Sequence, residues 1–363
     1  MPDKAALEEA RARIDAIDRE MAALFVQRMG VAADVAAYKS THNLPVLDAA
    51  REEAVLQKNL AYFTLPDLAG YYTDYMRHLM GLSRQYQSAL LGRDAVCYQG
   101  ALGGFGHMAA TALFPHARAT DAPTFAAVFA AVEKGDAACG VVPFENSSTG
   151  DVSDVLDLCY AYPGLYVSAM YDLPVTQNLL GLPGATLADI KAVCSHPQAL
   201  QQSRRFLSQL DAVQEPCENT AVAARAVAEG GDKTRAAIAS LEAGSLYGLV
   251  PLAWDISTES DNTTRFIVLT KEKPTAGNRF SLLVTVENGV GRLAQVIQAI
   301  SEHNFDMECI KSRPMPHRPW EYYFYIELVG NATGDTSRAL LDKLDESCLS
   351  VRMLGIYQRG ATG

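Results

Sequence analysis

The sequence predicts a multidomain chain: an all-α domain, then an α/β domain, then a smaller α+β domain. Three observations support this order. Residues 1–91 follow a helical rhythm of apolar positions, with breaks near 42–45 and 64–67. After Gly92, short apolar runs alternate with helical stretches, and a polar linker follows at 271–277. We therefore expect domains at 1–92, 93–272 and 278–358, which suits a chain of 363 residues.

Composition narrows the class of protein. The chain is 49% hydrophobic and 20% charged, which is typical of a globular protein. A net charge of −11 argues against nucleic acid or an anionic membrane as a partner. The start lacks an apolar leader, and no stretch approaches 18 apolar residues, so we expect a cytoplasmic protein. The seven cysteines have no CxxC or Cys/His spacing, so we expect free thiols, no metal and no cofactor.

The first predicted helix, from Glu9 to Lys39, carries a basic residue in an apolar seam. Apolar residues recur in this helix at alternating spacings of three and four, and Arg28 occupies a position where that pattern predicts an apolar side chain. Arg28 should be paired or face an anion, because burying an unpaired guanidinium costs free energy. Lys39 lies about three turns further on, near the same face, whereas Arg11 lies roughly 100° around the helix. Such a helix needs a partner to cover its seam. The seam consists of Ile14, Ile17, Met21, Leu24, Val31 and Val35.

Two further polar sets follow on helical spacing. Asp48, Arg51 and Glu52 share one face, and Ser83 and Gln87 form an i, i+4 pair. Together with the first helix they resemble the all-helical chorismate mutase family over about residues 5–90.

That resemblance implies a site for chorismate, a flexible dianion. Arg28 and Arg11, the latter from a second subunit, would bind the two carboxylates, and Arg51 would help to fix the site. Lys39 and Gln87 would donate to the ether oxygen. The remaining roles fall to Asp48 and Glu52 near the ring hydroxyl and to Ser83 near a carboxylate.

The middle region alternates predicted strands with predicted helices, which argues for an α/β domain with parallel-type sheets. The strands are expected at 95–99, 138–143, 165–171, 190–194, 236–238 and 267–269, and the helices at 107–114, 125–133, 151–160, 198–210 and 220–229.

Polar segments stand at the ends of several of these strands. The glycine-rich loop 100–106 does not follow the G-x-G-x-x-G spacing of a dinucleotide site. We interpret it instead as backbone that can approach an anion at a helix start. The segments 143–150, 195–198 and 261–266 have the same character, and together they predict a cleft between two lobes.

In order, Tyr98-Gln99-Gly100, PFENSSTG at 143–150, SHPQAL at 195–200, AAIAS at 236–240 and N-x-T-R-F at 262–266 resemble prephenate dehydratase over about residues 94–272. The resemblance implies two α/β lobes, similar to a small periplasmic-binding protein, with prephenate in the crevice. Thr264 would be the hydrogen-bond donor to the leaving hydroxyl. Gly106 departs from the family, which has Ser or Thr there. The implied binding residues are Glu145, Asn146, Ser147, Asn262, Arg265 and Phe266.

The last region has the order strand, helix, strand, strand, helix, strand, which is the ferredoxin-like plan. The segments Gly291-Arg292-Leu293 and Lys311-Ser312-Arg313-Pro314 resemble the effector motifs of a phenylalanine-binding ACT domain. Gly291, Leu293, Ser312, Arg313 and Pro314 would bind the effector, with Arg292 and Lys311 as basic residues near that pocket.

Taken together, these resemblances imply a bifunctional enzyme of phenylalanine biosynthesis that is inhibited by L-phenylalanine. It would convert chorismate to prephenate and prephenate to phenylpyruvate, as a homodimer or a dimer of dimers. Two alternatives stay open: a dehydratase that prefers arogenate, and a mutase joined to a non-catalytic, ligand-sensing two-lobed domain.

Overall fold

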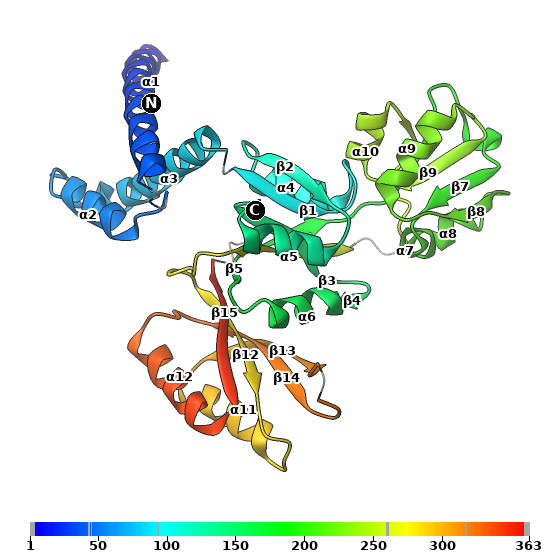
Figure 1. Ribbon diagram of the computed structural model, residues 1–363. Coiled ribbons are helices and arrows are strands. Elements are labelled where there is room, and N and C mark those ends of the chain that lie inside the picture. The colour runs from blue at the N-terminus through cyan, green and yellow to red at the C-terminus, as the bar shows by residue number, and fades with distance from the viewer. Residues whose placement is uncertain are drawn as a thin grey trace. The chain divides into compact units, whose positions relative to one another are not determined.

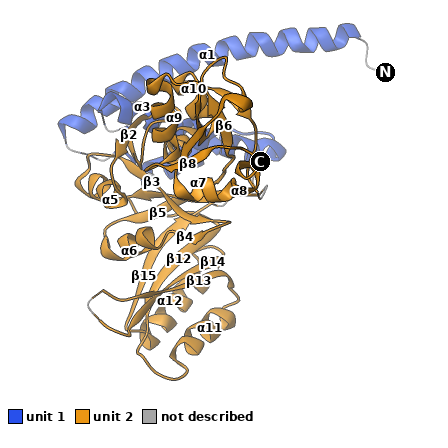
Figure 2. Cartoon of the chain, turned by 90° about the vertical axis from the view of Figure 1, so that its right-hand side faces the viewer, with its two compact units in different colours: residues 1–94 blue, residues 95–363 orange. Residues whose placement is uncertain are grey.

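The computed structural model describes residues 4–42, 44, 46–92, 94–258, 261–316 and 318–358 (Figure 1). The chain divides into two compact units, Met1–Asp94 and Ala95–Gly363 (Figure 2). In the part of the chain that the structure describes, no helix is both long and apolar enough to span a membrane.

The first unit consists of three helices: α1 (Lys4–Thr41), α2 (Ala49–Leu60) and α3 (Pro66–Leu90). The Asp48 side chain caps α2 by accepting from the backbone N–H of Arg51 at 2.9 Å. Met29, Leu56, Met76 and Leu79 form a small shared core. The predicted helices and the two breaks between them are confirmed, although Asn43 and Pro45 in the first break lie outside the described residues.

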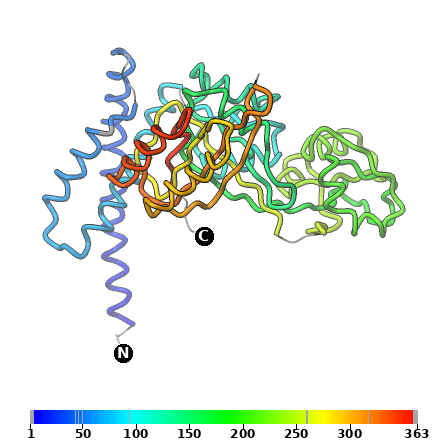
Figure 3. Tube along the Cα trace, turned by 90° about the horizontal axis from the view of Figure 1, so that it is seen from below, coloured from blue at the N-terminus to red at the C-terminus, as the bar shows by residue number. Residues whose placement is uncertain are grey.

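Helix α1 does not bury its predicted seam within the chain. Its buried residues are Met29, Ala32 and Ala36, whereas Ile14 and Leu24 of the seam are 56% and 62% exposed. Residues 4–27 are exposed throughout, and Figure 3 shows α1 extending beyond α2 and α3 toward the N-terminus. The apolar rhythm therefore marks a face that no described residue of this unit covers.

The second unit contains a ten-stranded sheet with the order β13-β14-β12-β15-β5-β11-β3-β1-β2, in which β4 also pairs with β3. Its N-terminal part carries α4 (Phe105–Leu113), α5 (Phe125–Lys134) and α6 (Ser153–Ala161). The strands of this part are β1 (Ala95–Gln99), β2 (Arg118–Ala122), β3 (Cys139–Asn146), β4 (Gly150–Asp151), β5 (Tyr166–Pro174) and β11 (Thr263–Thr270).

A separate five-stranded sheet has the order β10-β6-β9-β7-β8. It comprises β6 (Asn178–Gly181), β7 (Ala192–Ser195), β8 (Val213–Pro216), β9 (Arg235–Ala239) and β10 (Val250–Ala253). A 3-10 turn, η1 (Leu187–Asp189), and the helices α7 (Pro197–Gln202), α8 (Arg204–Leu207), α9 (Thr220–Gly230) and α10 (Leu241–Tyr247) accompany it.

Both sheets are mixed, so the expectation of parallel-type sheets is confirmed only in part: β1 runs parallel to β2 and β3, and β7 runs parallel to β8 and β9. In the larger sheet β11 runs antiparallel to both β3 and β5, and in the smaller sheet β6 runs antiparallel to β9. The cause is topological. The chain leaves the first sheet after β5 and returns in β11, which lies between β5 and β3 and runs opposite to both.

The C-terminal part has the elements β12 (Arg279–Thr285), α11 (Arg292–Glu302), β13 (Asp306–Pro314), β14 (Tyr322–Val329), α12 (Asp335–Ser347) and β15 (Ser350–Tyr357). The predicted order of strands and helices is confirmed. One face of its four strands packs on α11 and α12; on the other face Tyr323 stacks on Tyr160 of α6, and Tyr325 contacts Phe144 of β3. β15 also pairs with β5 at Gly355 and Val167, so the sheet continues from one part into the other.

Candidate functional site

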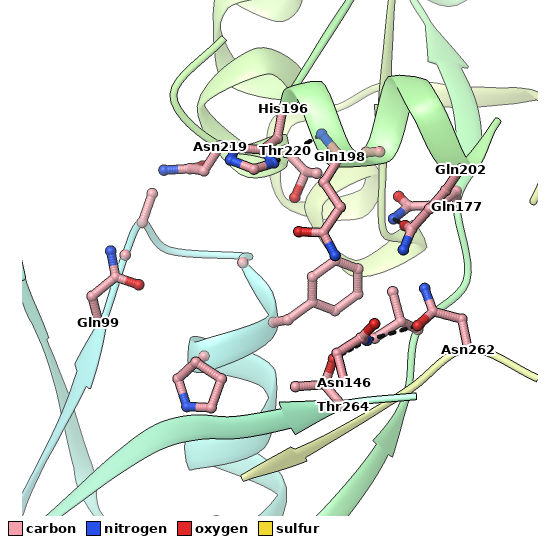
Figure 4. Close-up of a pocket in the computed structure, with 18 of the residues that line it drawn as sticks. Gln99, Asn146, Gln177, His196, Gln198, Gln202, Asn219, Thr220, Asn262 and Thr264 are labelled. Atoms are coloured by element: carbon pink, nitrogen blue, oxygen red, sulfur yellow. Dashed lines mark hydrogen bonds between the residues drawn. The ribbon is translucent and has the colours of Figure 1, made fainter. Parts of the chain in front are cut away.

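A cavity of about 220 Å³ lies between the two sheets of the second unit (Figure 4). The chain crosses between the sheets at 175–177 and returns at 254–262. The two crossings are hydrogen-bonded to each other, from Val175 N to Asn262 O and from Ile256 N to Gln177 O, both at 2.8 Å. The polar lining residues are Gln99, Asn146, Gln177, His196, Gln198, Gln202, Asn219, Thr220, Asn262 and Thr264.

Asn146 and Thr264 form the polar centre of the cavity wall. Asn146 Nδ2 donates to Thr264 Oγ1 at 2.9 Å and to Asn262 Oδ1 at 2.7 Å. Asn146 Oδ1 accepts from the backbone N–H groups of Ser148 and Thr149 at 3.0 and 3.1 Å, which fixes the amide orientation. Because the Thr264 oxygen already accepts a bond, its own proton is free to be donated toward a bound molecule.

Neutral amide and hydroxyl side chains make up most of the polar lining of the cavity, and no lysine or arginine occurs among its described lining residues. The helices α4 and α9 both begin at the wall, with Phe105 and Thr220 in their first turns. The positive dipole ends of both helices favour an anion, although the N–H of Val222 in the first turn of α9 is already bonded to Asn219 Oδ1 at 2.8 Å. Gln198 Nε2 donates to Thr149 Oγ1 at 3.1 Å and so joins the two sides of the cavity. The arrangement suits a small anionic, oxygen-rich ligand.

Three predicted binding residues lie outside the cavity lining. Along β11, Thr264 and Phe266 face the cavity, so Arg265 between them points to the opposite face, as strand alternation requires. There Arg265 Nε donates to Asp172 Oδ1 at 2.9 Å, and Nη1 reaches Glu145 Oε2 at 3.5 Å. Ser147 instead bonds the 261–263 backbone, donating to Asp261 O at 3.1 Å. Arg265, Glu145 and Ser147 thus support the cavity wall in this structure, and contact between them and a ligand stays a prediction.

Two glutamines of the cavity were not predicted. Gln177 is 2% exposed and donates from Nε2 to Gln202 Oε1 at 3.3 Å. This leaves Gln177 Oε1 and Gln202 Nε2 buried, with no partner among the described residues. Gln177 stands on the first crossing and Gln202 at the end of α7, so only the tertiary fold brings them together. His196 and Gln198 lie in a segment that the sequence did single out.

A second pocket of about 220 Å³ adjoins the first and shares Gln198, Gln202 and Asn262 with it. It is lined by hydroxyls and amides and by one cation, Arg204.

Gly106 lies where the chain leaves no room for a side chain. An ideal Cβ at this position would stand 2.6 Å from the carbonyl oxygen of Gln99. The hydroxyl that the family resemblance led us to look for therefore cannot be added to this backbone without moving the loop.

We expect Gly106→Ser to destabilise the second unit by roughly 1–3 kcal/mol, because overpacking forces the backbone to shift. Gly164→Ser is the matched control, since a Cβ there meets nothing within 4 Å. Thermal melting of the two variants measures the difference. Equal melting temperatures for the two variants would show that the loop accommodates a side chain.

The first unit gathers a second polar cluster between α1 and α3. Arg28 Nη1 donates to Ser83 Oγ, and Ser83 Oγ also donates to Leu79 O at 3.0 Å. Lys39 Nζ donates to Val46 O. Gln87 is buried, and its Oε1 has no partner among the described residues. Arg28 and Ser83 thus meet across α1 and α3, whereas a joint anion site formed by Arg28, Lys39, Ser83 and Gln87 stays a prediction.

The other predicted residues of this unit, Glu52, Asp48, Arg51 and Arg11, have separate surroundings. Glu52 pairs with Arg84, a cation that the sequence reasoning missed although it follows Ser83 directly. Asp48 serves as the N-cap of α2, and Arg51 is exposed. Among the described residues, the ion-pair partner of Arg11 is Glu8, at 3.0 Å. It lies seventeen residues before Arg28, which is about 25 Å along a helix, so it cannot serve the same cluster within one chain.

The predicted effector residues on the strands lie near one end of the C-terminal strands. Thr285, before the loop that leads to Gly291, and Arg313 on β13 both stand opposite Tyr323 of β14. Leu293 is in the first turn of α11, whereas Ser312 and Pro314 are exposed. Arg313 is already engaged: its Nε donates to Asp157 Oδ1 at 2.9 Å, and this guanidinium holds the pKa of Asp157 below its usual value.

Among the described residues, no group of three or more His, Cys, Asp or Glu side chains is placed to hold a metal ion.

Comparison with known proteins gives concordant results for both units. The family described as chorismate mutase type II matches residues 10–88, and the family described as prephenate dehydratase matches residues 96–274. A bifunctional chorismate mutase/prephenate dehydratase of Aquifex aeolicus is 31% identical over 97% of this chain and 98% of its own.

Two solved structures extend the comparison. A prephenate dehydratase from Arthrobacter aurescens, solved in complex with L-Phe, is 26% identical with a TM-score of 0.68, and the match covers 73% of this chain and 90% of that one. GqqA, described as a novel type of quorum quenching acylase, is 28% identical with a TM-score of 0.67, over 73% of this chain and 98% of that one.

Proposed function

The chain belongs to the family of bifunctional chorismate mutase/prephenate dehydratases, and we propose from this that each compact unit carries one of the two reactions. The enzyme rearranges chorismate to prephenate and then converts prephenate to phenylpyruvate, water and CO₂. No free-standing nucleophile is needed for either step, because the first is pericyclic and the second is driven by aromatisation.

In the first unit, the proposed mutase residues are those on the facing sides of α1 and α3. Arg28 binds one carboxylate, with Ser83 beside it. Lys39 and Gln87 donate to the ether oxygen, on which negative charge develops as the C–O bond breaks. Glu52, held by Arg84, and Asp48 lie at the ring hydroxyl, and Arg51 helps to fix the site. Holding the flexible dianion in its folded conformer accounts for most of the rate enhancement.

In the second unit, we assign the dehydratase reaction to the cavity between the sheets. Thr264 donates its proton as a hydrogen bond to the leaving hydroxyl of prephenate, while Asn146 polarises the Thr264 oxygen. Loss of CO₂ supplies the electron pair that breaks the C–O bond, and the departing hydroxide, hydrogen-bonded by Thr264, becomes water with one proton taken up from solvent. Phe266 packs beneath the ring, and Asn262 orients Asn146. The starts of α4 and α9 stabilise the carboxylates. The single observation that carries this assignment is the bond from Asn146 to Thr264.

Regulation and assembly form a further part of the proposal. The C-terminal part, from 278 to 358, is an ACT domain that binds L-phenylalanine at Gly291, Leu293, Ser312, Arg313 and Pro314 and inhibits the dehydratase. Phenylalanine in the Arthrobacter aurescens structure supports this effector. The dehydratase domain occupies residues 93–272, as two lobes of the periplasmic-binding-protein kind.

The exposed apolar seam of α1 supports a homodimer, alone or paired into a dimer of dimers. A second copy of α1 would cover Ile14, Ile17 and Leu24, whose exposure in one chain is unfavourable. In that dimer Arg11 of the partner subunit completes the site that holds Arg28.

This assembly predicts complementation between two inactive variants. Arg11→Ala and Arg28→Ala should each lose mutase activity, and an unfolded and refolded equimolar mixture should recover about a quarter of it, because half of the dimers are mixed and each holds one intact site. Titrating phenylalanine into the same mixture tests feedback on the dehydratase. A mixture no more active than either variant would contradict the shared site.

An arogenate-preferring dehydratase is the alternative substrate preference. Arogenate carries an amine where prephenate has a keto oxygen, and the Gln177–Gln202 pair presents both a donor and an acceptor to the cavity. Steady-state kinetics with the two substrates compare kcat/KM directly.

A further inference from the structure

Lys311, on β13 of the C-terminal part, lies against the dehydratase strands instead of an effector pocket. Its side chain is 8% exposed, and its ammonium pairs with Asp151 and with Glu145 Oε1 at 3.2 Å. The same ammonium stands 5.0 Å from the centre of the Phe144 ring. The expectation that Lys311 borders the effector site is therefore replaced by a contact between two parts of the second unit that are about 160 residues apart in sequence.

Lys311 is one member of a chain of alternating charges behind the cavity wall. The order is Asp172, Arg265, Glu145, Lys311, Asp151. Arg265 Nε lies 2.9 Å from Asp172 Oδ1, and Arg265 Nη1 lies 3.5 Å from Glu145 Oε2. Burial opposes the charge on Lys311, but its bond to Asp151 and the nearby carboxylates raise its pKa above the ordinary value. Both cations therefore stay charged at neutral pH, and Glu327 adds negative charge near Arg265.

The two carboxylates that Lys311 joins are the ends of a hairpin that enters the active site. Glu145 and Asp151 are cross-strand partners on β3 and β4, and so are Asn146 and Gly150. The turn between them supplies the N–H groups of Ser148 and Thr149 that orient the Asn146 amide. Without Lys311, Asp151 would lose its cation and Glu145 would keep only the longer contact to Arg265, so the two carboxylates on paired residues would repel each other and loosen the hairpin next to Asn146.

We propose that Lys311 is a positioning residue for the dehydratase reaction, which clamps the 145–151 hairpin and so holds Asn146 against Thr264. The proposal rests on the role assigned above to the Asn146–Thr264 bond. It also makes the C-terminal part a structural component of the dehydratase site, because β13 supplies the clamp.

The test compares prephenate kinetics of Lys311→Met with those of Lys311→Met/Asp151→Asn in the full-length enzyme. Removing the cation should lower kcat by about 10- to 100-fold with KM changed less, since a misplaced donor affects the transition state more than binding. Removing the opposing charge as well should restore most of kcat. Arg279→Met is the matched control, because Arg279 pairs with Glu308 inside the C-terminal part and should leave kcat unchanged.

Mutase activity and thermal melting monitor the fold in each variant. A wild-type kcat in Lys311→Met would overturn the proposal, and so would a folded double variant whose kcat is no higher than that of Lys311→Met. If Lys311→Met does not fold, the double variant decides alone: a kcat within about threefold of wild type supports the clamp, and a larger loss refutes it. Thr264→Val in the same assay distinguishes a failure of the proposed dehydratase site from a failure of the Lys311 proposal. Full dehydratase activity of Thr264→Val would refute the role assigned to Thr264, whatever the Lys311 variants show.

Discussion

Replacing Thr264 with valine is expected to lower dehydratase kcat by about 10²–10³-fold, the usual effect of removing one hydrogen-bond donor to developing charge. Valine keeps the shape of threonine but cannot donate to the leaving hydroxyl or accept from Asn146 Nδ2. The mutase reaction belongs to the other compact unit, so its kcat and KM should not change. Separate assays with prephenate and with chorismate measure both effects on one preparation.

Thr263→Val is the matched control for this result. Thr263 precedes Thr264 on β11, but it does not line the cavity, and the strand alternation turns it to the other face. Its dehydratase activity should remain within about twofold of wild type. Equal activity in both variants would contradict the assignment of Thr264 as the donor.

Replacing Arg28 with alanine is expected to lower mutase kcat/KM by at least about 10²-fold, because a charge-assisted bond to a carboxylate is lost in a partly buried site. The Ser83 hydroxyl, which now accepts from Arg28, cannot supply the missing charge. Chorismate disappearance, followed in steady state, gives the measurement, and prephenate turnover should be unaffected.

Arg77→Ala controls for the loss of a cation from the same unit. Arg77 is exposed on α3, so we expect mutase activity close to that of wild type. A similar loss in both variants would indicate a general electrostatic effect and would contradict the specific role of Arg28.

Much of the fold follows from local patterns. The helices of the first unit and the order of the C-terminal elements follow from apolar periodicity, and Asn146, Asn262 and Thr264 follow from polar segments at strand ends. Side chains alternate between the two faces of a strand. Treating Thr264-Arg265-Phe266 as part of a strand would therefore have predicted that Arg265 points to the face opposite Thr264.

Other features depend on contacts between distant segments, which periodicity does not report. Gln177 reaches the cavity because the chain crosses between sheets at that residue, and Lys311 meets Glu145 only because β13 packs against β3 and β4. The antiparallel direction of β11 likewise follows from where the chain re-enters the sheet. The apolar face of α1 is a pattern of another kind, because the described residues of the chain leave this predicted face exposed.

The most direct test of two reactions in two independent sites feeds chorismate to the wild type, to Thr264→Val, to Arg28→Ala and to a mixture of the two variants. Chorismate loss, prephenate and phenylpyruvate are followed together. We predict phenylpyruvate from the wild type, prephenate accumulation with Thr264→Val, and almost no turnover with Arg28→Ala. The mixture should form phenylpyruvate again from released prephenate. Loss of both activities in either folded variant would contradict the account, because it would mean that the two sites are not separable.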